Sequence, residues 1–595
     1  MGSLRTAGAG ALRAGHAGDE VRLAGWVSAR RDHGGIVFVD LRDASGVAQV
    51  VIDPERSTEM AEIAQRLRDE YCIAVAGTVR PRPEGMVNPE MATGEIEVEA
   101  ASIEVLSPAA PLPFTIDDRI EADEVNRLRH RYLDLRRPRM AANLRARSGA
   151  IRAMRRSLED QGFLEVETPT LIKSTPEGAR DFLVPSRLRK GTFYALPQSP
   201  QLFKQLLMVG GVERYYQIAR CYRDEDFRAD RQVEFTQLDL EGAFWEEDDV
   251  FAALEAVMAG VVAELRGAAV EIPFPRLTYA EAMARYGTDK PDIRFGMEIV
   301  EVTDVFAGSE FRAFAGVAAS DGLVAGIDAG PLGLSRAGMD ALVESAKVLG
   351  AKGLVWIVVE DDGSLRSPVA KFLGEAERDA LIAAFGAEPG DVLLLAGDEP
   401  RVVRSVLGAL RLDVGKPAGH DELRFLWVTD FPVFEVQEDG TLAAAHHAFT
   451  SPVDVVEMEE RPETALSRAY DLVLNGSELG SGSIRIHDPE IQARVFKVLG
   501  IADEEARSRF GWFLEALRYG TPPHGGFAVG IDRLVSILQG ESNIREVIPF
   551  PKTQTGFDPL TESPAPVAGA QLAELGIEVS AAARAELEED GRPPA

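Results

Sequence analysis

Apolar and polar residues alternate with the two-residue period of β-strands along the first hundred positions. Five segments follow this alternation: residues 21–31, 35–42, 47–53, 72–80 and 95–106. The third and fourth are separated by a stretch with helical spacing, residues 58–71, in which Thr58 can cap apolar Met60, Ile63, Ala64 and Leu67. Five strands with one helix after the third is the order of an OB-fold, a small barrel that binds single-stranded nucleic acid. We assign this fold to residues 1–107.

The rest of the chain changes character several times. Residues 108–120 hold prolines without periodicity, which is typical of a linker. A long helix is predicted over 140–161, followed at 163–169 by a strand that Pro169 would stop. Gly, Ala and Val dominate 289–420, with helix-like and strand-like pieces such as 353–359 and 392–397 and no catalytic pattern, which indicates an inserted domain. The Ala/Glu-rich tail, 562–595, is expected to be partly disordered.

One predicted strand carries polar side chains where a core strand would not. In the segment YRDEDFRADRQVEFTQLDLE, residues 222–241, one face shows Phe235, Gln237, Asp239 and Glu241, and the other Thr236, Leu238 and Leu240. Buried unpaired carboxylates are expensive, so this strand suits the floor of a polar pocket, with Arg223 delivered from the preceding strand. A guanidinium for phosphate and an aromatic ring for a base fit a nucleotide. A solvated amphipathic hairpin is the alternative.

Four other segments supply polar groups: residues 174–187, 198–205, 471–485 and 525–538. In the last, a Gly-containing strand runs into a helix that begins near Ile531, with Arg533 in its first turn. The helix dipole disfavours an arginine there unless it partners an anion bound at that terminus. The alternative is a core helix with a surface arginine. The sequence has neither a P-loop nor a Rossmann glycine motif.

Composition restricts the function classes. Two cysteines far apart argue against disulfides and against a cysteine-based zinc site. No apolar run is long enough for a membrane span, and residues 2–18 lack the apolar core of a secretory signal, so we expect a cytoplasmic protein. The net charge of −32 argues against nonspecific nucleic-acid binding. Residues 127–156, however, contain eleven arginines and one acid, Asp134, which form either an RNA-facing surface or structural ion pairs.

The motifs together resemble the class II aminoacyl-tRNA synthetases. The sequence RDEDFRADRQVEFTQLD resembles motif 2, and in particular motif 2 of the bacterial aspartyl enzymes. The predicted helix and strand with Pro169 are similar to motif 1, which forms a dimer interface. The sequence GFAVGIDR, residues 526–533, resembles motif 3. WVSARRDHGG and the residues after it resemble the anticodon-binding barrel. The resemblance covers nearly the whole chain. It implies an α+β multidomain fold with an N-terminal OB-fold barrel and an antiparallel-sheet catalytic domain, 121–288 and 421–561, into which an α/β domain is inserted.

The resemblance also implies residue roles at the nucleotide. Arg223 would hold the ATP α-phosphate, Arg533 the γ-phosphate, and Phe235 would stack under adenine. With Glu478, these arginines would be the catalytic residues. Further nucleotide contacts would come from Asp224, Glu225, Gln232, Gly530, Ile531 and Asp532. Asp471 and Glu478 would bind Mg²⁺, because carboxylate oxygens suit this ion, and no zinc is expected.

For the amino acid, the resemblance implies that Arg485 and Lys204 bind the side-chain carboxylate of aspartate and that His446 closes over the substrate. The remaining contacts would come from Glu177, Ser199, Gln201, Arg223 and Asp239, with the ammonium among Glu177, Gln201 and Asp239. A bidentate guanidinium–carboxylate pair would select aspartate over asparagine. Mispairing such a buried group costs roughly 3–5 kcal/mol. Without the resemblance, His446-His447 would be a surface pair.

The barrel would bind the anticodon through Trp26, Arg30, Arg31, His33, Phe38 and Gln49; core packing of the two aromatic residues and solvation of the arginines are the alternatives. Enzymes restricted to the aspartate tRNA tend to carry leucine at the position of His33. The pattern His33-Gly34-Gly35, with Gly85 in a later loop, resembles relaxed enzymes that charge tRNA(Asp) and tRNA(Asn). The expected partners are these tRNAs, ATP, L-aspartate and a second copy of the chain.

Three alternative functions would leave different signatures in the sequence. An asparaginyl or lysyl synthetase would share the barrel and motifs, but the long insertion and the Arg485/Lys204 pair count against both. A noncatalytic paralogue would lack at least one of Arg223, Glu478 and Arg533, and all three are present. A tRNA-independent ligase that makes asparagine would lack the barrel. A synthetase strictly specific for tRNA(Asp) stays open.

Overall fold

The computed structural model describes residues 4–53, 55, 57–175, 179–226, 228–415, 422–437 and 439–589. The chain divides into two compact units: Met1–Arg145 with Pro549–Ala565, and Ala146–Ile548 with Pro566–Ala595. No helix in the described ranges combines the length and hydrophobicity that a membrane span requires. The finer domain boundaries drawn from the sequence stay predictions.

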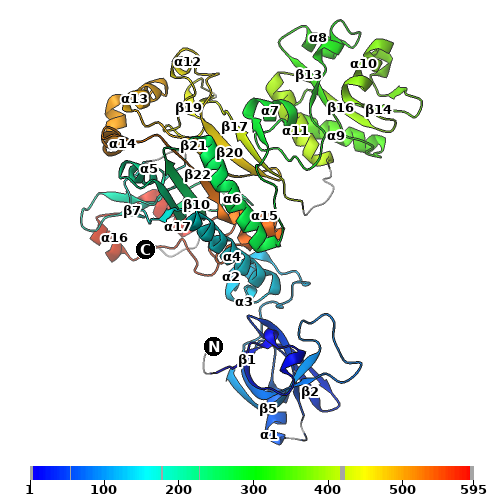
Figure 1. Cartoon of the computed structure of the whole chain (residues 1–595), viewed down its shortest axis with the longest axis vertical. Helices are drawn as coiled ribbons and strands as arrows, with labels where there is room; N and C mark the ends of the chain where they lie inside the picture. The colour runs from blue at the N-terminus through cyan, green and yellow to red at the C-terminus, as the bar shows by residue number, and fades with distance from the viewer. Residues whose placement is uncertain are drawn as a thin grey trace. The chain divides into compact units, whose positions relative to one another are not determined.

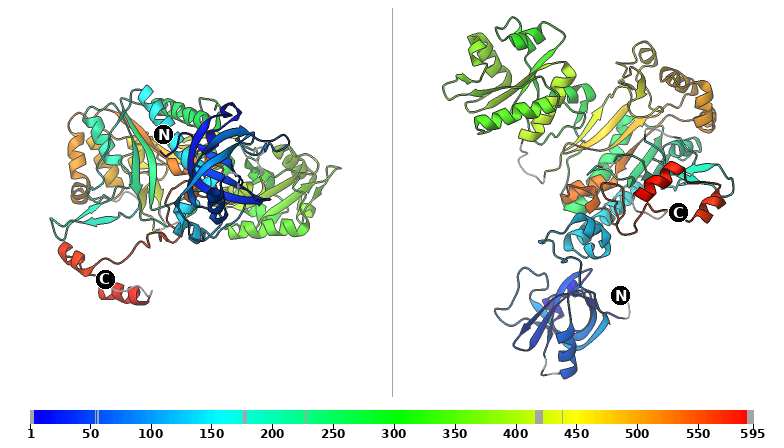
Figure 2. Two further views of the ribbon diagram at one scale, coloured as in Figure 1. Left: turned by 90° about the horizontal axis from the view of Figure 1, so that it is seen from below. Right: turned by 180° about the vertical axis from the view of Figure 1, so that it is seen from behind.

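The first unit contains a closed five-stranded barrel, drawn in blue in Figure 2. Its strands run in the order β1 (Glu20–His33), β2 (Ile36–Asp43), β3 (Gly46–Ile52), β5 (Ile96–Ser107) and β4 (Cys72–Pro81). Alternate residues such as Leu23, Val39 and Val75 fill the interior and are fully buried. The OB-fold predicted from the alternation is confirmed. A β-bulge between Val27 and Ala29 shifts the inward face of β1 by one position.

The helix after β3 is shorter than predicted and has a different cap. It is α1, Thr58–Arg66, and its N-cap is Ser57, whose Oγ accepts a hydrogen bond from Met60 N at 3.2 Å. Thr58 is therefore the first helical residue, and its predicted capping role is wrong. The helix ends because Leu67 turns into the barrel core.

The arginine-rich segment 127–156 begins in this unit and continues into the second, and most of its arginines contact other parts of the protein. Asp134, the last residue of α3 (Arg131–Asp134), is completely buried and contacts three arginines: Arg127 of α2 (Glu124–Arg129), Arg131 and Arg137. Among the eleven arginines, seven form ion pairs: Arg127, Arg131, Arg136, Arg137, Arg147, Arg152 and Arg155. Of the two explanations that the sequence left open, structural ion pairs account for most of this segment.

An eight-stranded sheet forms the centre of the second unit (Figure 1). Its strands are, in order, β11 (Arg276–Thr278), β17 (Phe425–Thr429), β20 (Ala469–Leu474), β21 (Ser477–Ile484), β22 (His524–Gly530), β10 (Glu234–Ala243), β9 (Arg214–Tyr222) and β6 (Leu164–Glu165). All neighbours pair antiparallel except the two outermost pairs, β11 with β17 and β6 with β9. The strand predicted over 163–169 is thus reduced to two residues at the sheet edge.

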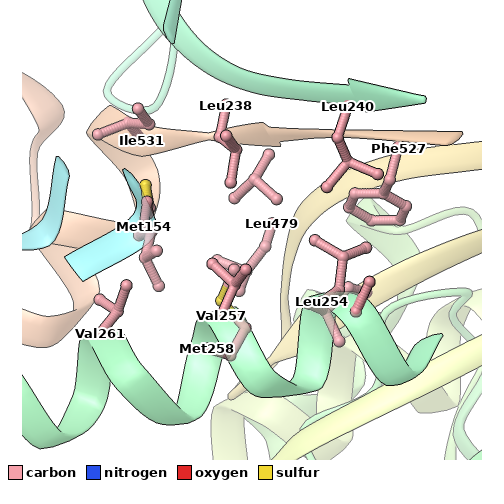
Figure 3. Packing of buried hydrophobic residues seen from close by; sticks show 14 of the residues in the cluster. Met154, Leu238, Leu240, Leu254, Val257, Met258, Val261, Leu479, Phe527 and Ile531 are labelled. Atoms are coloured by element: carbon pink, nitrogen blue, oxygen red, sulfur yellow. The ribbon is translucent and has the colours of Figure 1, made fainter. Parts of the chain in front are cut away.

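Three helices cover one face of this sheet: α4 (Pro138–Asp160), α6 (Glu247–Arg266) and α15 (Ile531–Gln539). Figure 3 shows Leu238, Leu240 and Phe527 from the strands packing against Leu254 and Val257 of α6. The long helix and the helix starting at Ile531 are confirmed within two residues. Because side chains alternate along a strand, the positions between these leucines point to the opposite face.

A separate five-stranded sheet lies within the segment predicted as an insertion. Its order is β12 (Val300–Glu301), β13 (Leu323–Asp328), β16 (Val392–Asp398), β14 (Val355–Val359) and β15 (Leu365–Arg366). Helices α9 (Arg336–Val348) and α11 (Pro400–Val414) pack on one face, and α8 (Arg312–Ala318) and α10 (Glu375–Phe385) on the other. The inserted α/β fold is confirmed. In the tail, two helices, α16 (Gly569–Leu575) and α17 (Ala581–Glu589), occupy residues for which no element was predicted.

Candidate active site

A cavity of about 600 Å³ opens on the polar face of the eight-stranded sheet. Residues before and in α5 (Gln201–Val209), the loop between β9 and β10, strands β20 to β22 and the first turn of α15 line it. It brings together most of the residues predicted for ATP, aspartate and Mg²⁺: Ser199, Gln201, Lys204, Arg223, Glu225, Gln232, Phe235, Asp239, His446, Asp471, Glu478, Arg485, Gly530, Asp532 and Arg533. Residues from five separate stretches of sequence (199–204, 223–239, 446, 471–485 and 530–533) therefore share one chamber.

Two predicted residues, Ile531 and Asp224, do not line the cavity. Ile531 is fully buried in the hydrophobic core under the sheet, so its side chain does not reach the cavity. Asp224 does not line it either; its carboxylate lies 3.6 Å from Arg180, and its backbone pairs with the same residue. Glu177 lies outside the described residues.

One end of the cavity is rich in arginine. The guanidinium of Arg223 lies over the Phe235 ring at 5.2 Å, and its buried Nε has no hydrogen-bond partner within the described part of the chain. Arg533 donates to the backbone carbonyl of Glu478 and lies 3.1 Å from Asp230 of the β9–β10 loop. An unpaired guanidinium N–H beside an aromatic face suits a phosphate next to a planar base.

At the other end, two cations and two carboxylates form a buried cluster. Lys204 Nζ lies 2.8 Å from Asp239 Oδ2 and 3.2 Å from Glu241 Oε2. Arg485 donates to both Glu241 oxygens, from Nε at 2.9 Å and Nη2 at 3.2 Å. All four side chains are at most 3% exposed. Formal charges cancel within this four-residue cluster, which allows it to exist in the protein interior.

The two carboxylates of this cluster differ in acidity. Burial raises the pKa of Glu241, but the charges and hydrogen bonds of Arg485 and Lys204 outweigh it, and the net pKa is lowered. At Asp239, burial outweighs Lys204 and raises the pKa to about 6. Asp239 Oδ1 and the nearby Gln201 Nε2 are both buried without a partner among the described residues. An acceptor and a donor thus face the same chamber, which is what an amino acid with an ammonium and a carboxylate needs.

The partners of Arg485 correct one expectation. Its bidentate partner is Glu241. The guanidinium edge that we expected to bind the substrate carboxylate therefore already binds a carboxylate of the protein. Its Nη1 contacts Ser483 Oγ at 2.8 Å and His447 Nε2 at 2.6 Å. The physical reason is that a fully buried cation without a permanent counter-ion is too costly in the empty protein. A substrate carboxylate can therefore meet this arginine only through a single remaining N–H or by displacing a neighbour.

The pKa values of two adjacent histidines, His446 and His447, are shifted in opposite directions. His446 Nε2 lies 3.1 Å from Asp471 Oδ1; burial lowers the His446 pKa, but the hydrogen bond and charge of Asp471 outweigh it, and the net pKa is raised. Burial and the Arg485 cation hold the pKa of His447 well below its usual range, so this ring is neutral. His446 Nδ1 is buried and has no partner among the residues that the structure describes. The unpaired Nδ1 of His446, which lines the cavity, is therefore open to a ligand, and the raised pKa favours the protonated form in which this nitrogen carries a hydrogen.

The barrel presents a second polar surface. The bulge in β1 puts Arg31 opposite Phe38 on the outward face, where Arg31 binds Asp40 through two hydrogen bonds of 2.7 and 2.8 Å. His33 packs edge-on against Phe38, with the ring centroids 5.9 Å apart. Gln49 extends this face on β3, and its amide donates to Glu97 at 3.0 Å. Predicted Arg31, His33, Phe38 and Gln49 thus lie on one face.

The other three anticodon candidates lie elsewhere on the barrel. Arg30 donates to the carbonyl of Ala64 at the end of α1, and Gly85 is exposed in a turn. The guanidinium of Arg136 covers the ring of Trp26, 4.7 Å from the ring centroid. The same guanidinium also binds Glu70 at 2.8 Å. Trp26 is neither in the barrel core nor free on the surface, since it packs under the helical segment that follows the barrel. Its role in RNA binding stays a prediction.

Comparisons with known proteins agree with this architecture. Residues 123–554 match the family model described as tRNA synthetases class II (D, K and N), and residues 21–106 match that of the OB-fold nucleic acid binding domain. The chain belongs to the class II tRNA synthetases. A relative from Saccharopolyspora erythraea, named Aspartate--tRNA(Asp/Asn) ligase, is 53% identical over 98% of this chain and 97% of its own length. One of the same name from Bacillus mycoides is 51% identical, covering 97% and 99%.

Solved synthetases share the fold at lower identity. The asparaginyl-tRNA synthetase from Pyrococcus horikoshii, complexed with asparaginyl-adenylate, has a TM-score of 0.57 at 20% identity and covers 91% of this chain and 96% of its own. The aspartyl tRNA synthetase from Entamoeba histolytica has a TM-score of 0.56 at 20% identity, with coverages of 91% and 89%. These likenesses support the fold of the synthetase.

Several residues that line or support the cavity of this synthetase were not among the predicted site residues. Glu241 is the counter-ion of both Lys204 and Arg485, and the strand alternation could have identified it, because it shares the face of Asp239. His447 could have been assigned from its neighbour. Other lining residues come from segments outside those predicted for the pocket: Tyr279, Asp289, Phe431 and Glu435. No local pattern marks these, since their position depends on the packing of distant strands.

Proposed function

We propose that this synthetase joins L-aspartate to tRNA in two steps, by way of aspartyl-adenylate, and that it charges both tRNA(Asp) and tRNA(Asn). The observation that carries the substrate assignment is the cluster of Lys204, Arg485, Asp239 and Glu241, which lies away from Phe235 along β10. It offers cations for an acidic side chain and a free acceptor for an ammonium. The activity printed for the relatives that are 51–54% identical supports the same assignment.

Aspartate would lie between the cluster and the two histidines. Its side-chain carboxylate would meet Arg485, Lys204 and the protonated His446, and its ammonium would meet Asp239 Oδ1. Asparagine would bring a neutral amide, whose NH₂ group is a donor facing donors. Discrimination therefore follows from the N–H donors of the cluster, which a carboxylate oxygen can accept and an amide NH₂ group cannot.

ATP would occupy the arginine end. Phe235 offers a face for adenine, Arg223 a free N–H for the α-phosphate, and Arg533 a cation for the far end of the triphosphate. These groups neutralise charge as the aspartate carboxylate attacks the α-phosphorus. Asp230 and Glu225, which now pair with Arg533 and Arg231, would be replaced by phosphate oxygens.

Asp471 and Glu478 fit a Mg²⁺ ion that arrives with ATP. Both line the cavity, and burial together with the nearby Asp471 charge raises the pKa of Glu478, as expected for two neighbouring carboxylates in a buried site. No cluster of three or more metal-binding side chains occurs in the described ranges, which suits an ion held by one or two carboxylates and by phosphates. When bound, the ion would supply charge neutralisation at the triphosphate.

Dual tRNA specificity is proposed from His33 and the glycines after it. His33 lies at the exposed end of β1, beside Phe38, on the polar face of the barrel. The two anticodons differ at their last base, and a small loop here leaves room for either base, where a bulkier side chain would discriminate by shape.

The decisive experiment compares substrates in two assays. ATP–pyrophosphate exchange is measured with aspartate, asparagine and lysine, and charging is measured with transcripts of both tRNAs. We expect exchange with aspartate alone and comparable charging of both transcripts. Exchange with lysine or asparagine instead would refute the amino-acid assignment. A preference for tRNA(Asp) of about a hundredfold, or ~2.7 kcal/mol, would leave a strictly specific enzyme.

A further inference from the structure

A buried ion pair joins helix α4 to the floor of the nucleotide end of the cavity. Arg147, whose side chain is 11% exposed, contacts Asp532 Oδ1 through Nη1 and donates from Nη2 to Thr236 Oγ1 at 2.8 Å. The other carboxylate oxygen, Asp532 Oδ2, accepts from Thr236 N at 2.9 Å. Both oxygens of Asp532 therefore hold fixed partners within the protein.

The neighbours of this network are the residues assigned to ATP. Thr236 lies between Phe235 and Gln237 on β10, and both of these line the cavity. Asp532 immediately precedes Arg533 in the first turn of α15. The bonds to Thr236 and Asp532 consequently set the separation between the strand that offers the adenine platform and the helix that carries the arginine for the triphosphate.

Electrostatics gives Arg147 a second effect. Asp532 lines the same cavity as Arg223 and Arg533 and is only 3% exposed. A carboxylate without a counter-ion at this depth would repel the phosphates of ATP, because like charges interact strongly where water is excluded. Arg147 provides that counter-ion from behind the site, without lining the cavity itself.

We propose that Arg147 is a positioning residue for ATP, which acts through Asp532 and Thr236 by holding β10 against α15 and by neutralising the Asp532 carboxylate. The inference rests on the proposed function for its assay. It also changes the role of Asp532, which becomes the link between helix α4 and the nucleotide rather than a direct contact to ATP.

The test uses aspartate-dependent ATP–pyrophosphate exchange with the full chain. In Arg147→Met we expect the KM for ATP to rise about tenfold or more, as for loss of a charge-assisted contact, while the KM for aspartate stays within about twofold. Arg147→Met combined with Asp532→Asn, which removes the unpaired charge, should recover at least about threefold of the lost ATP affinity. The matched control is Arg152→Met, also on α4, which removes an ion pair with Glu264 of α6 and should change neither KM.

The outcomes separate the inference from the proposed function. If the unmodified chain shows no aspartate-dependent exchange, the proposed function fails before any variant is compared. If it is active, a parallel rise in both KM values, a change in the KM for ATP of less than about threefold, or no recovery in the double variant overturns the role of Arg147. Should Arg147→Met not fold, Arg147→Lys decides: it keeps the charge but cannot contact Asp532 and Thr236 together, so an unchanged KM for ATP would overturn the proposal.

Discussion

Arg485 is the residue at which the aspartate assignment can be tested most directly, by the substitution Arg485→Leu. The side chain makes two hydrogen bonds to Glu241, at 2.9 and 3.2 Å, one to Ser483 at 2.8 Å, and a contact of 2.6 Å to His447. Leucine removes all of these and leaves Lys204 as the single cation beside two carboxylates. The carboxylate of a bound aspartate would then be the third anion in the same buried space.

The expected loss follows from the cost of breaking a buried charge pair, about 3–5 kcal/mol. At about 1.4 kcal/mol per tenfold change, kcat/KM for aspartate should fall by roughly a hundredfold to several thousandfold. The binding of ATP, measured by calorimetry with a non-hydrolysable analogue, should stay nearly unchanged, because Arg223, Phe235 and Arg533 are not bonded to Arg485. The exchange assay reports the loss, and Arg494→Leu, which breaks an exposed pair with Glu459, is the control.

Two results would refute this reasoning. The first is a value of kcat/KM for aspartate in Arg485→Leu within about tenfold of the parent. The second concerns the double variant Arg485→Leu/Glu241→Gln, in which the net charge of the four-residue cluster is again zero but no guanidinium is present. It should regain thermal stability and stay inactive with aspartate. Recovered activity would mean that Arg485 only balances Glu241 and does not contact the substrate.

Three further predictions concern the pH profile, the barrel and the fold. Because the Asp239 pKa is raised to about 6, its carboxylate is protonated below that pH, and the KM for aspartate should rise there. The His446 pKa is also raised, and loss of the His446 proton should raise the KM for aspartate on the alkaline side. A flat pH profile of kcat/KM would contradict both assignments. Arg31→Ala should lower tRNA charging by about tenfold, the scale of one hydrogen bond from a charged group, without changing exchange; a defect in exchange would show that the barrel acts on adenylate formation. Buried Arg411 donates to the carbonyls of Asp292, Phe295, Gly296 and Met297. Arg411→Met should therefore lower the free energy of unfolding by about 2–4 kcal/mol, measured by thermal or urea denaturation. An unchanged midpoint would show that these carbonyls find other donors.

The sequence predicted the elements better than their ends. Periodicity located the barrel strands and the helix at Ile531, because these segments bury one face and the pattern reports burial directly. The cap of α1 was misplaced by one residue, since Ser57 and Thr58 are both good caps and only the backbone angles distinguish them. The strand after Gly162 was overestimated, because pairing with β9 ends after two residues at the sheet edge.

The site residues were easier to find than their partners. Polar residues on a strand face signal a pocket, but no pattern tells whether Arg485 holds a substrate or Glu241, since that depends on which strands lie side by side. Strand β21 places Ser481 and Ser483, strand β22 places Gly526 and Ala528, and strand β10 places Asp239 and Glu241 on one polar face of the sheet. Gly526 is necessary there, because an added Cβ would lie 1.9 Å from Glu241 Oε2. The sequence shows the glycine, and only the fold shows the carboxylate that it accommodates.

The four-residue charge cluster of Lys204, Asp239, Glu241 and Arg485 also explains how an empty site can be stable and still bind an anion. A cavity lined by unpaired cations would destabilise the fold, so each cation keeps a carboxylate of its own. Beside the cluster, Asp239 Oδ1, Gln201 Nε2 and His446 Nδ1 have no partner among the described residues, and these atoms are available to a ligand. These three are expected to be the atoms that the substrate satisfies. If the structure of an aspartate complex left them without partners, the cluster would be a structural ion pair beside the true binding site, and the argument for aspartate would lose its physical basis.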